Sequence, residues 1–359
     1  METSEKTRIY QELYRKAEAF CEVENDLVAK MANLCVIMHE DLGHWWTGFY
    51  RVVDDQLVLG PFQGPVACTR IRMGKGVCGG AWKQQRTLVV PDVHQFPGHI
   101  ACSSASNSEI VVPIWSRGTI VGEIDIDSTE FGAFDDTDAF WLERIAALMT
   151  ADIDLGLKDY IKAEILPQYD GFDPAHRLDH VHSVIASSLV YAGHYDVSPQ
   201  MCYAIAAYHD TGLAIGREVH HSESARIIRE DSRLQQWFTA QEIETMAQAA
   251  QDHRASSKSE PRSIYGRIVA EADRQIDPFI IVLRTVQYGL CHYPQLDKEG
   301  NWQRTLEHLN EKYARGGYLR LWIPFGPNAA KLQEMQEIIE NDPAMLRRMF
   351  EKAWEQALS

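Results

Sequence analysis

The sequence contains no long uninterrupted run of apolar residues. A membrane-spanning helix needs about 18 of them in succession. The N-terminal segment METSEKTRIYQELYRKAEAF is a charged helical pattern rather than a basic stretch that leads into an apolar one. We therefore expect neither a membrane span nor a secretory leader, and we expect a cytoplasmic location.

Basic residues are few relative to acidic ones. The chain has 35 Lys and Arg against 51 Asp and Glu, which gives a formal net charge of −16. Binding to a phosphate backbone needs a basic patch, and none can be found in the sequence. The charge balance therefore disfavours nucleic acid as a partner and favours small molecules.

Cysteine is also scarce, with seven residues that lack dense, regular spacing. An odd number of scattered cysteines is unlike a secreted disulfide framework, so any disulfide here is expected to take part in a reaction. P-loop and dinucleotide fingerprints are missing as well, because GKGVCGG matches neither pattern well.

The chain has two halves with different residue patterns. Its 359 residues, 45% of them hydrophobic, leave room for two ordinary domains. Between about 47 and 127 lie the β-type runs TGFYRVV, QLVLGPF, TLVVPD, SEIVVPI and TIVGEIDID. Helical patterns flank them, one near 5–40 and one that starts at FDDTDAFWLERIAALM. This half predicts an α+β domain, an antiparallel sheet flanked by helices.

From about residue 155 onward helical periodicity replaces the β-type alternation. Helix start signals occur at Asp173-Pro174, at Ser198-Pro199 and at Thr239, where TAQE reads as a capping box. The second half is therefore predicted to be all-α, with a boundary near 152–158 that gives domains 1–154 and 155–359. Residues 290–359 carry no recognisable site and form a helical extension, with two helices broken at Asp342-Pro343.

A group of carboxylates lies in the first half. The strand period of two places Glu123, Asp125 and Asp127 on one face and Ile124 and Ile126 on the other. An antiparallel hairpin that turns around 117–118 pairs positions summing to about 235–236, which brings Glu109 opposite Asp125–Asp127. Such a cluster fits either a solvated edge or a pocket for a positively charged ligand, such as an amino group.

Cys68, Cys78 and Cys102 bunch within about 35 residues. Cys78 lies in a glycine-rich turn that leads toward a helix, where backbone N–H groups and the helix dipole favour a thiolate. Spacings of ten and twenty-four residues, without a C-x₂-C pair, disfavour a zinc site. A thiol redox cycle with a sulfenic acid and a disulfide fits better. The other four cysteines are expected to pack in cores: Cys21, Cys35, Cys202 and Cys291.

Four motifs of this half resemble the free methionine-(R)-sulfoxide reductases, enzymes built on a GAF domain, over about residues 40–145. They are WWTGFY, GPVACTRIRMGKGVCG, DVHQFPGHIACSSASNSEIVVPI and GEIDIDSTEFGAFDDTD. The resemblance implies reduction of free methionine sulfoxide with no cofactor in this domain, a thioredoxin-like reductant and a homodimer. It assigns Cys102 as the nucleophile, with Cys78 and Cys68 as resolving or recycling thiols.

The same resemblance assigns the substrate pocket. Trp46 and Tyr50 would form its wall against the methyl-sulfoxide end. The residues that would hold the amino group and help to protonate the sulfoxide oxygen are Glu109, Asp125 and Asp127. Glu123 departs from the family pattern, which more often has an apolar residue at that position.

A series of metal-binding residue types occupies the second half. His209 and Asp210 end the apolar helical run in SPQMCYAIAAYHDTGLAIG, and this pair suits Mn²⁺, Fe²⁺, Mg²⁺ or Zn²⁺. Across roughly 173–285 the ordered series resembles the HD-domain metal-dependent phosphohydrolases. The family core maps to His180, His209, Asp210 and Asp273. The further histidines resemble the subset that can hold two metals with Asp210 as the bridge: His220 or His221, and His253.

Two choices among these histidines rest on spacing. His180 and His182 point about 200° apart on a helix, so both cannot bind one ion. The family spacing favours His180, and His220 is preferred to His221.

Two functions compete for the whole chain. In the first, a free methionine sulfoxide reductase is fused to a phosphohydrolase whose substrate is an unknown phosphoester or nucleotide. In the second, the GAF-type domain senses an oxidant or small molecule and regulates the HD-type domain. A sensor would be expected to have lost one of the three motif cysteines, and all three are present. A third hypothesis is that the helical half is a metal-bound scaffold without activity.

Overall fold

A computed structural model describes residues 3–98, 105–172, 177–254, 259–274 and 276–358. The chain forms two compact units, Met1–Gln251 and Asp252–Ser359. The boundary predicted near 152–158 lies inside the first unit and stays a prediction about domains. Within the described ranges, no helix is both long and apolar enough to cross a bilayer.

Six antiparallel strands form one sheet in the first unit, in the order β3-β2-β1-β6-β5-β4. The five predicted β-type runs are all strands. Among the strands of the described residues, only the two-residue strand β3 was not predicted, because it is too short to show alternation. The strands are β1 Trp46–Val53, β2 Gln56–Gln63, β3 Arg70–Ile71, β4 Leu88–Val90, β5 Ser108–Ser116 and β6 Thr119–Ser128.

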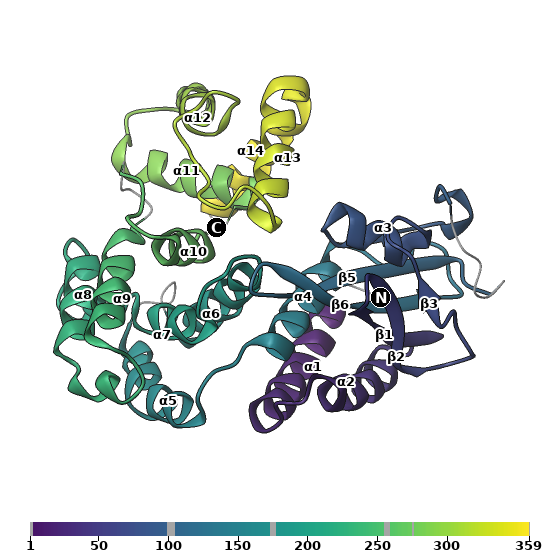
Figure 1. Ribbon diagram of the computed structural model, residues 1–359. Coiled ribbons are helices and arrows are strands. Elements are labelled where there is room, and N and C mark those ends of the chain that lie inside the picture. Colours follow the sequence, from purple (N-terminus) through teal and green to yellow (C-terminus); the bar gives the residue numbers. More distant parts are fainter. Residues whose placement is uncertain (1–2, 99–104, 173–176, 255–258, 275, 359) are drawn as a thin grey trace. The chain divides into compact units, whose positions relative to one another are not determined.

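Helices cover both faces of this sheet (Figure 1). Helices α1 (Thr3–Val23), α2 (Leu27–Leu42) and α4 (Asp136–Thr150) pack on one face, over a core that includes Ile124 and Ile126. Helix α3 (Gly76–Gln84) packs on the other face. The predicted α+β fold, an antiparallel sheet flanked by helices, is therefore confirmed.

The single N-terminal helix predicted near 5–40 is wrong, because two helices occupy that segment. Asp26 caps α2 by accepting a hydrogen bond from the Ala29 N–H. The Glu24 carboxylate accepts from the N–H groups of Asn25 and Asp26, which draws the chain out of the first helix. Local polar side chains therefore override the continuous helical periodicity.

The β5–β6 hairpin has the predicted turn and register. Its turn is at Arg117–Gly118, where both residues have positive φ. Glu109 pairs with Asp127 and Ser116 pairs with Thr119, so paired positions sum to 236 near the pocket and 235 near the turn. An irregularity between Ile114 and Trp115 accounts for the change of one residue. The predicted carboxylate face is thus positioned by strand pairing.

The rest of the first unit is helical. Ser198 caps α7 at Pro199, and Thr239 and Glu242 bond reciprocally at the start of α9, as predicted. The start predicted at Asp173-Pro174 lies outside the described residues. The longer helices are α5 Leu155–Tyr160, α6 Leu178–Gly193, α7 Pro199–Tyr208, α8 His220–Glu230 and α9 Ala240–Asp252. Helix α9 runs one residue past the unit boundary. The described connections include a π turn at Ile161–Ile165 and 3-10 turns at Leu166–Gly171, Thr211–Ala214 and Ser232–Gln236.

The second unit is helical and has its own core, built around Val282, Leu309 and Phe350. Its predicted break at Asp342-Pro343 is confirmed, since α13 ends at Asn341 and α14 begins at Pro343. Together the two units confirm the predicted all-α second half. The helices are α10 Ile264–Ala272, α11 Pro278–His292, α12 Lys298–Tyr313, α13 Pro327–Asn341 and α14 Pro343–Leu358.

Candidate functional site

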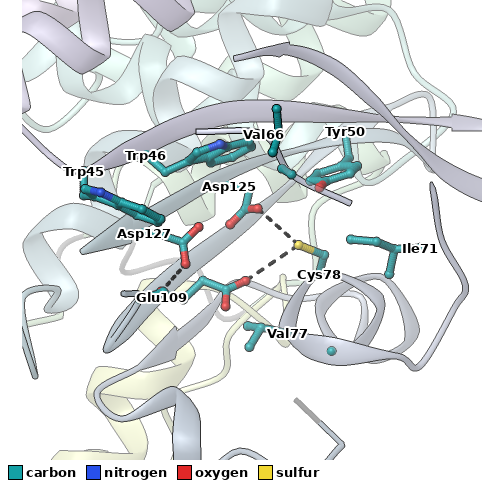
Figure 2. Close-up of a pocket in the computed structure, with 13 residues that line it drawn as sticks. Trp45, Trp46, Tyr50, Val66, Ile71, Val77, Cys78, Glu109, Asp125 and Asp127 are labelled. Atoms are coloured by element: carbon teal, nitrogen blue, oxygen red, sulfur yellow. Dashed lines mark hydrogen bonds between the residues drawn. The ribbon is translucent and has the colours of Figure 1, made fainter. Parts of the chain in front are cut away.

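A cavity of ≈ 50 Å³ lies between α3 and the sheet face opposite α1, α2 and α4 (Figure 2). Both arms of the predicted carboxylate hairpin line it, together with α3 and the start of β1. The lining residues with chemistry or aromatic rings are Trp45, Trp46, Tyr50, Cys78, Ser106, Glu109, Asp125 and Asp127. All the described residues that the resemblance assigns to the substrate pocket therefore line one cavity.

Cys78 lies between two carboxyl groups in this cavity. Its Sγ is 3.4 Å from Asp125 Oδ2 and 3.7 Å from Glu109 Oε1. Asp127 accepts a hydrogen bond from Ser106 at the cavity edge. The solvated edge that the sequence left open as an alternative is excluded, because Glu109 and Asp125 are buried.

Two acids of this pocket, Glu109 and Asp125, and the Cys78 thiol favour their neutral forms. Burial, reinforced by Asp125 and Asp127, raises the pKa of Glu109 well above its usual value, and burial with Asp127 does the same for Asp125. The pKa of the Cys78 thiol is also raised, by burial first and then by the surrounding carboxylates. The expectation of a Cys78 thiolate is therefore wrong, because desolvation and like charge outweigh the helix N-terminus.

Asp127 differs from its two neighbours. Burial raises its pKa only to about 6, because the hydrogen bond from Ser106 stabilises the charged form. The pocket therefore combines a carboxyl group that ionises readily, Asp127, with two whose raised pKa values favour the protonated form. Such a separation is how one site supplies both a charge partner and an acid.

Glu123 lies on the same strand face, deeper in the protein. Its side chain is fully buried, and neither of its oxygens has a hydrogen-bond partner within the described part of the chain. Burial and Asp125 raise its pKa well above the usual value. A charge on Glu123 would have no hydrogen-bond donor to compensate it among the described residues, so burial favours the neutral acid.

Two aromatic residues of β1 form the wall of the pocket and hold the loop that carries Cys68. The Trp46 indole N–H donates to the Pro65 carbonyl at 3.0 Å, and the Tyr50 hydroxyl donates to the Cys68 carbonyl at 2.9 Å. A Cβ at Gly48 would be 2.4 Å from the Trp46 ring. Glycine is therefore required for this ring to lie flat on its own strand.

The remaining cysteine predictions have mixed outcomes. Cys68 is disulfide-bonded, Cys78 is a free thiol, and Cys102 lies outside the described residues. The core positions predicted for Cys21, Cys35 and Cys202 are confirmed, since all three are buried. Cys291 is exposed near the end of α11, so its predicted packing role is wrong.

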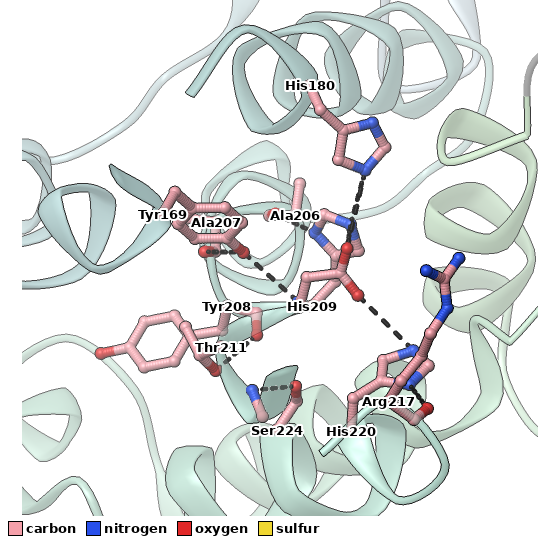
Figure 3. Close-up of polar contacts among 12 residues, drawn as sticks. Tyr169, His180, Ala206, Ala207, Tyr208, His209, Thr211, Arg217, His220 and Ser224 are labelled. Carbon is pink, nitrogen blue, oxygen red and sulfur yellow. Dashed lines mark hydrogen bonds and ion pairs between the residues drawn. The ribbon is translucent and has the colours of Figure 1, made fainter. Parts of the chain in front are cut away.

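A second cluster, which includes His180, His209 and His220, lies in the helical part of the first unit (Figure 3). Asp210 Oδ2 lies 3.3 Å from His209 Nε2 and 3.7 Å from His180 Nε2, while Oδ1 lies 3.5 Å from His220 Nε2. The Nε2 atoms of His180 and His209 are 3.3 Å apart. Side chains from α6, the end of α7 and the start of α8 thus converge on one carboxylate.

The hydrogen bonds behind two of these histidines suit a divalent metal. His209 Nδ1 lies 2.7 Å from the Ala206 carbonyl, and His220 Nδ1 lies 2.7 Å from the Arg217 carbonyl. A carbonyl only accepts, so each Nδ1 donates and each Nε2 of a neutral ring turns a lone pair toward Asp210. Lone pairs facing a carboxylate repel it unless a cation lies between them. These nitrogen and oxygen donors therefore fit a metal ion.

The other predicted ligands are placed as follows. His221 follows His220 in α8, its ring edge-on to that of His220 at 5.5 Å. His182 is exposed on α6. His253 and Asp273 belong to the second unit, where His253 is buried and Asp273 follows the last residue of α10. Whether His253 and Asp273 join the Asp210 cluster stays a prediction.

Two lining residues of the first pocket were not singled out from the sequence. Ser106 controls the ionisation of Asp127, and Trp45 extends the aromatic wall beside Trp46. Both lie inside quoted motifs, at GHIACSSASNSEI and WWTGFY. Their position within those motifs was the one feature of the sequence that could have indicated a place in the pocket.

Comparisons with known proteins match the two halves separately. The GAF domain model matches residues 26–154, and the HD domain model matches residues 177–275. The GAF domain-containing protein A of Dictyostelium discoideum is 49% identical over 141 residues, which are 39% of this chain and 89% of that protein.

Two further similar proteins are named as reductases. The free methionine-R-sulfoxide reductase of Escherichia coli (strain K12) is 47% identical over 143 residues, 40% of this chain and 87% of that protein. A crystal structure of the Neisseria meningitidis free methionine-R-sulfoxide reductase with its substrate is 47% identical, with a TM-score of 0.40, and covers 42% of this chain and 90% of that chain. The chain therefore belongs, through its GAF domain, to the free methionine-(R)-sulfoxide reductase family, and it carries an HD domain fused behind that domain.

Proposed function

We propose that the first half of the chain reduces free L-methionine-(R)-sulfoxide. The observation that carries this proposal is the buried pocket that Glu109, Asp125 and Asp127 line together with the Trp46 and Tyr50 rings. A free amino group is a natural partner for the ionised Asp127, and the rings suit a thioether chain. Protonated carboxyl groups nearby can assist the departure of the sulfoxide oxygen.

The reaction proceeds in three steps. The Cys102 thiolate attacks the sulfoxide sulfur, a pocket acid protonates the oxygen, and methionine leaves as that oxygen moves to Cys102 as a sulfenic acid. A second thiolate then attacks Cys102 and releases water, which leaves a disulfide. A thioredoxin-like dithiol reduces the disulfide and becomes oxidised itself.

We assign Cys68 as the partner of Cys102 in that disulfide. Cys68 is already disulfide-bonded, whereas Cys78 is a thiol kept neutral between two carboxyl groups. A neutral thiol is a poor nucleophile, so Cys78 is poorly suited to the resolving step.

Peptide mapping of the enzyme after one turnover tests this assignment. Reduced enzyme mixed with one equivalent of sulfoxide, then alkylated, should yield a Cys68–Cys102 disulfide and an alkylated Cys78. Cys68→Ser should still complete the first turnover and then stop recycling. A disulfide that joins Cys102 to Cys78 in the wild-type enzyme would overturn the assignment.

The pocket also predicts the pH dependence of substrate binding. Asp127 is neutral below a pKa of about 6 and ionised above it, so the partner for the substrate ammonium appears as pH rises. KM for the sulfoxide should therefore fall between pH 5 and 7, as steady-state kinetics can show. Ser106→Ala removes the bond that lowers this pKa, so its inflection should move to higher pH. An inflection unchanged by Ser106→Ala would argue against Asp127 as the ammonium partner.

We also propose that the HD domain is a metal-dependent phosphohydrolase. His180, His209, Asp210 and His220 would hold the divalent ion, with His253 and Asp273 as further ligands predicted from the family spacing. A bound divalent ion lowers the pKa of a coordinated water and neutralises phosphoryl oxygens. The backbone carbonyls of Ala206 and Arg217 accept from the Nδ1 atoms of His209 and His220, which orients both rings and fixes Nε2 as the available nitrogen.

A panel of phosphoesters and nucleotides tests the second activity on the full chain. Hydrolysis should require Mn²⁺, Fe²⁺, Mg²⁺ or Zn²⁺ and should stop when a chelator removes the ion. Metal binding without hydrolysis of any compound in the panel would instead favour the hypothesis that the helical half is a metal-bound scaffold without activity.

One observation favours the sensor as a second candidate function. The β5–β6 hairpin carries the pocket acids at one end, and its turn contacts the end of α6. There the Gly118 N–H donates to the Gly193 carbonyl at 2.8 Å, and the Trp115 ring lies 4.2 Å from that of His194. His180 lies in the first turn of the same helix. A hairpin and a helix in series therefore join the two sites within the first unit.

Metal affinity with and without pocket ligand measures this coupling. If the hairpin transmits occupancy, saturating free methionine should change the Mn²⁺ dissociation constant by about 5-fold or more, and the metal should change the methionine affinity by the same factor. Trp115→Ala should reduce both effects together. Equal Mn²⁺ affinities with and without methionine would exclude the sensor function.

A further inference from the structure

We propose that the reductase pocket is also a site for a thiophilic divalent cation, Zn²⁺ above all, bound by Cys78, Glu109 and Asp125 in competition with the substrate. One ligand atom from each of these three residues lies within 4.8 Å of the others, and all three side chains are buried. The cysteine spacing disfavoured a zinc site because the sequence has no C-x₂-C pair among these cysteines. The fold instead brings one thiol to two carboxyl groups from β5 and β6.

The distances match those between the ligands of one zinc ion. A tetrahedral ion with a Zn–S bond of about 2.3 Å and Zn–O bonds of about 2.1 Å holds its sulfur and oxygen ligands about 3.6 Å apart. Cys78 Sγ is 3.4 Å from Asp125 Oδ2 and 3.7 Å from Glu109 Oε1 (Figure 2). Both sulfur–oxygen distances therefore match those around a single tetrahedral ion.

A buried oxygen of the proposed ligand group also supports a cation site. Asp125 Oδ1 has no hydrogen-bond partner within the described residues, although its side chain is only 5% exposed. Buried acceptors without donors are costly, and a cation at the cluster would compensate them.

The ion and the substrate exclude each other because they need the same groups. The proposed reaction uses Glu109 and Asp125 as proton donors to the sulfoxide oxygen, and the same two carboxyl groups would bind Zn²⁺ in the same cavity. Binding replaces the Cys78 thiol proton by a sulfur–zinc bond, and the protons held by Cys78, Glu109 and Asp125 are released to solvent. The competition rests on the proposed reductase function, whereas metal binding does not.

Cobalt(II) spectroscopy on the full chain tests the site without measuring turnover. Co²⁺ takes the place of Zn²⁺, and only a thiolate ligand adds a sulfur-to-cobalt charge-transfer band. The Asp210 cluster consists of nitrogen and oxygen donors and gives no such band. We expect the band in the wild-type protein, its loss in Cys78→Ser, and its retention in Cys291→Ser, which removes an exposed thiol instead.

A carboxylate variant and a chiral competitor complete the design. Glu109→Gln retains the thiol and should weaken cobalt binding by about tenfold or more, so the test does not depend on Cys78→Ser folding well. L-methionine should displace the band, whereas D-methionine, which chelates free cobalt equally well, should displace it much less. No band in the wild type, or an unchanged band in Cys78→Ser, would overturn the site. A Cys78-dependent band that L-methionine does not displace would overturn the competition alone.

Discussion

Cys102→Ser should abolish sulfoxide reduction while leaving the rest of the protein intact. A serine hydroxyl is far less nucleophilic than a thiolate, so kcat/KM for free L-methionine-(R)-sulfoxide should fall by roughly 10³-fold or more. The pocket acids and aromatic wall come from other segments, so binding of the product methionine should persist. Single-turnover formation of methionine, together with a methionine titration, measures both quantities.

Cys291→Ser is the matched control, because it removes an exposed thiol far along the sequence from every pocket residue. Its turnover should equal that of the wild type. Methionine formation by Cys102→Ser with added thiol reductant would show that another group attacks the sulfur. Loss of methionine binding in the same variant would show that the substitution damaged the pocket instead.

Asp210→Asn should remove the bound divalent metal together with any phosphoester hydrolysis. The Nε2 atoms of three histidines lie around this carboxylate. Removing its charge should therefore weaken metal binding by all of these ligands at once. His253→Ala, by contrast, should remove at most one of two ions, because it would lose one terminal imidazole rather than a bridging ligand. Elemental analysis at matched protein concentration compares the two.

His182→Ala provides the control for a histidine on the same helix as His180. His182 is exposed, whereas His180 contacts both His209 and Asp210. His180→Ala should therefore lose metal, and His182→Ala should retain it. Full metal content in purified Asp210→Asn would show that the ion binds elsewhere. Sulfoxide reduction should survive all of these changes if the two domains act independently.

The sheet and the carboxylate hairpin could be predicted because local patterns control them. Alternation in the β6 segment separates Ile124 and Ile126 from the acids, and the turn at 117–118 then determines which residues pair. Caps at Ser198 and Thr239 are equally local. Where the information lies within a few residues, sequence reasoning predicted the structure correctly.

The ionisation of the site could not be predicted in the same way. A helix N-terminus favours a Cys78 thiolate, but that argument does not include Glu109 and Asp125, which strand pairing brings beside the sulfur. Nor does the sequence reveal that a hydrogen bond from Ser106 lowers the pKa of Asp127 relative to the pKa values of its neighbours. These effects depend on burial and on contacts between distant segments, which periodicity does not encode.

The most direct test of the central proposal is turnover of four sulfoxides by the reduced full-length protein. The substrates are the (R) and (S) epimers of free L-methionine sulfoxide, and the same two epimers with the amino group acetylated. A pocket that pairs Asp127 with a free ammonium and presents one face of the sulfur to Cys102 predicts efficient reduction of the free (R) epimer alone. Comparable reduction of the acetylated (R) epimer, or of the free (S) epimer, would contradict this account of the pocket.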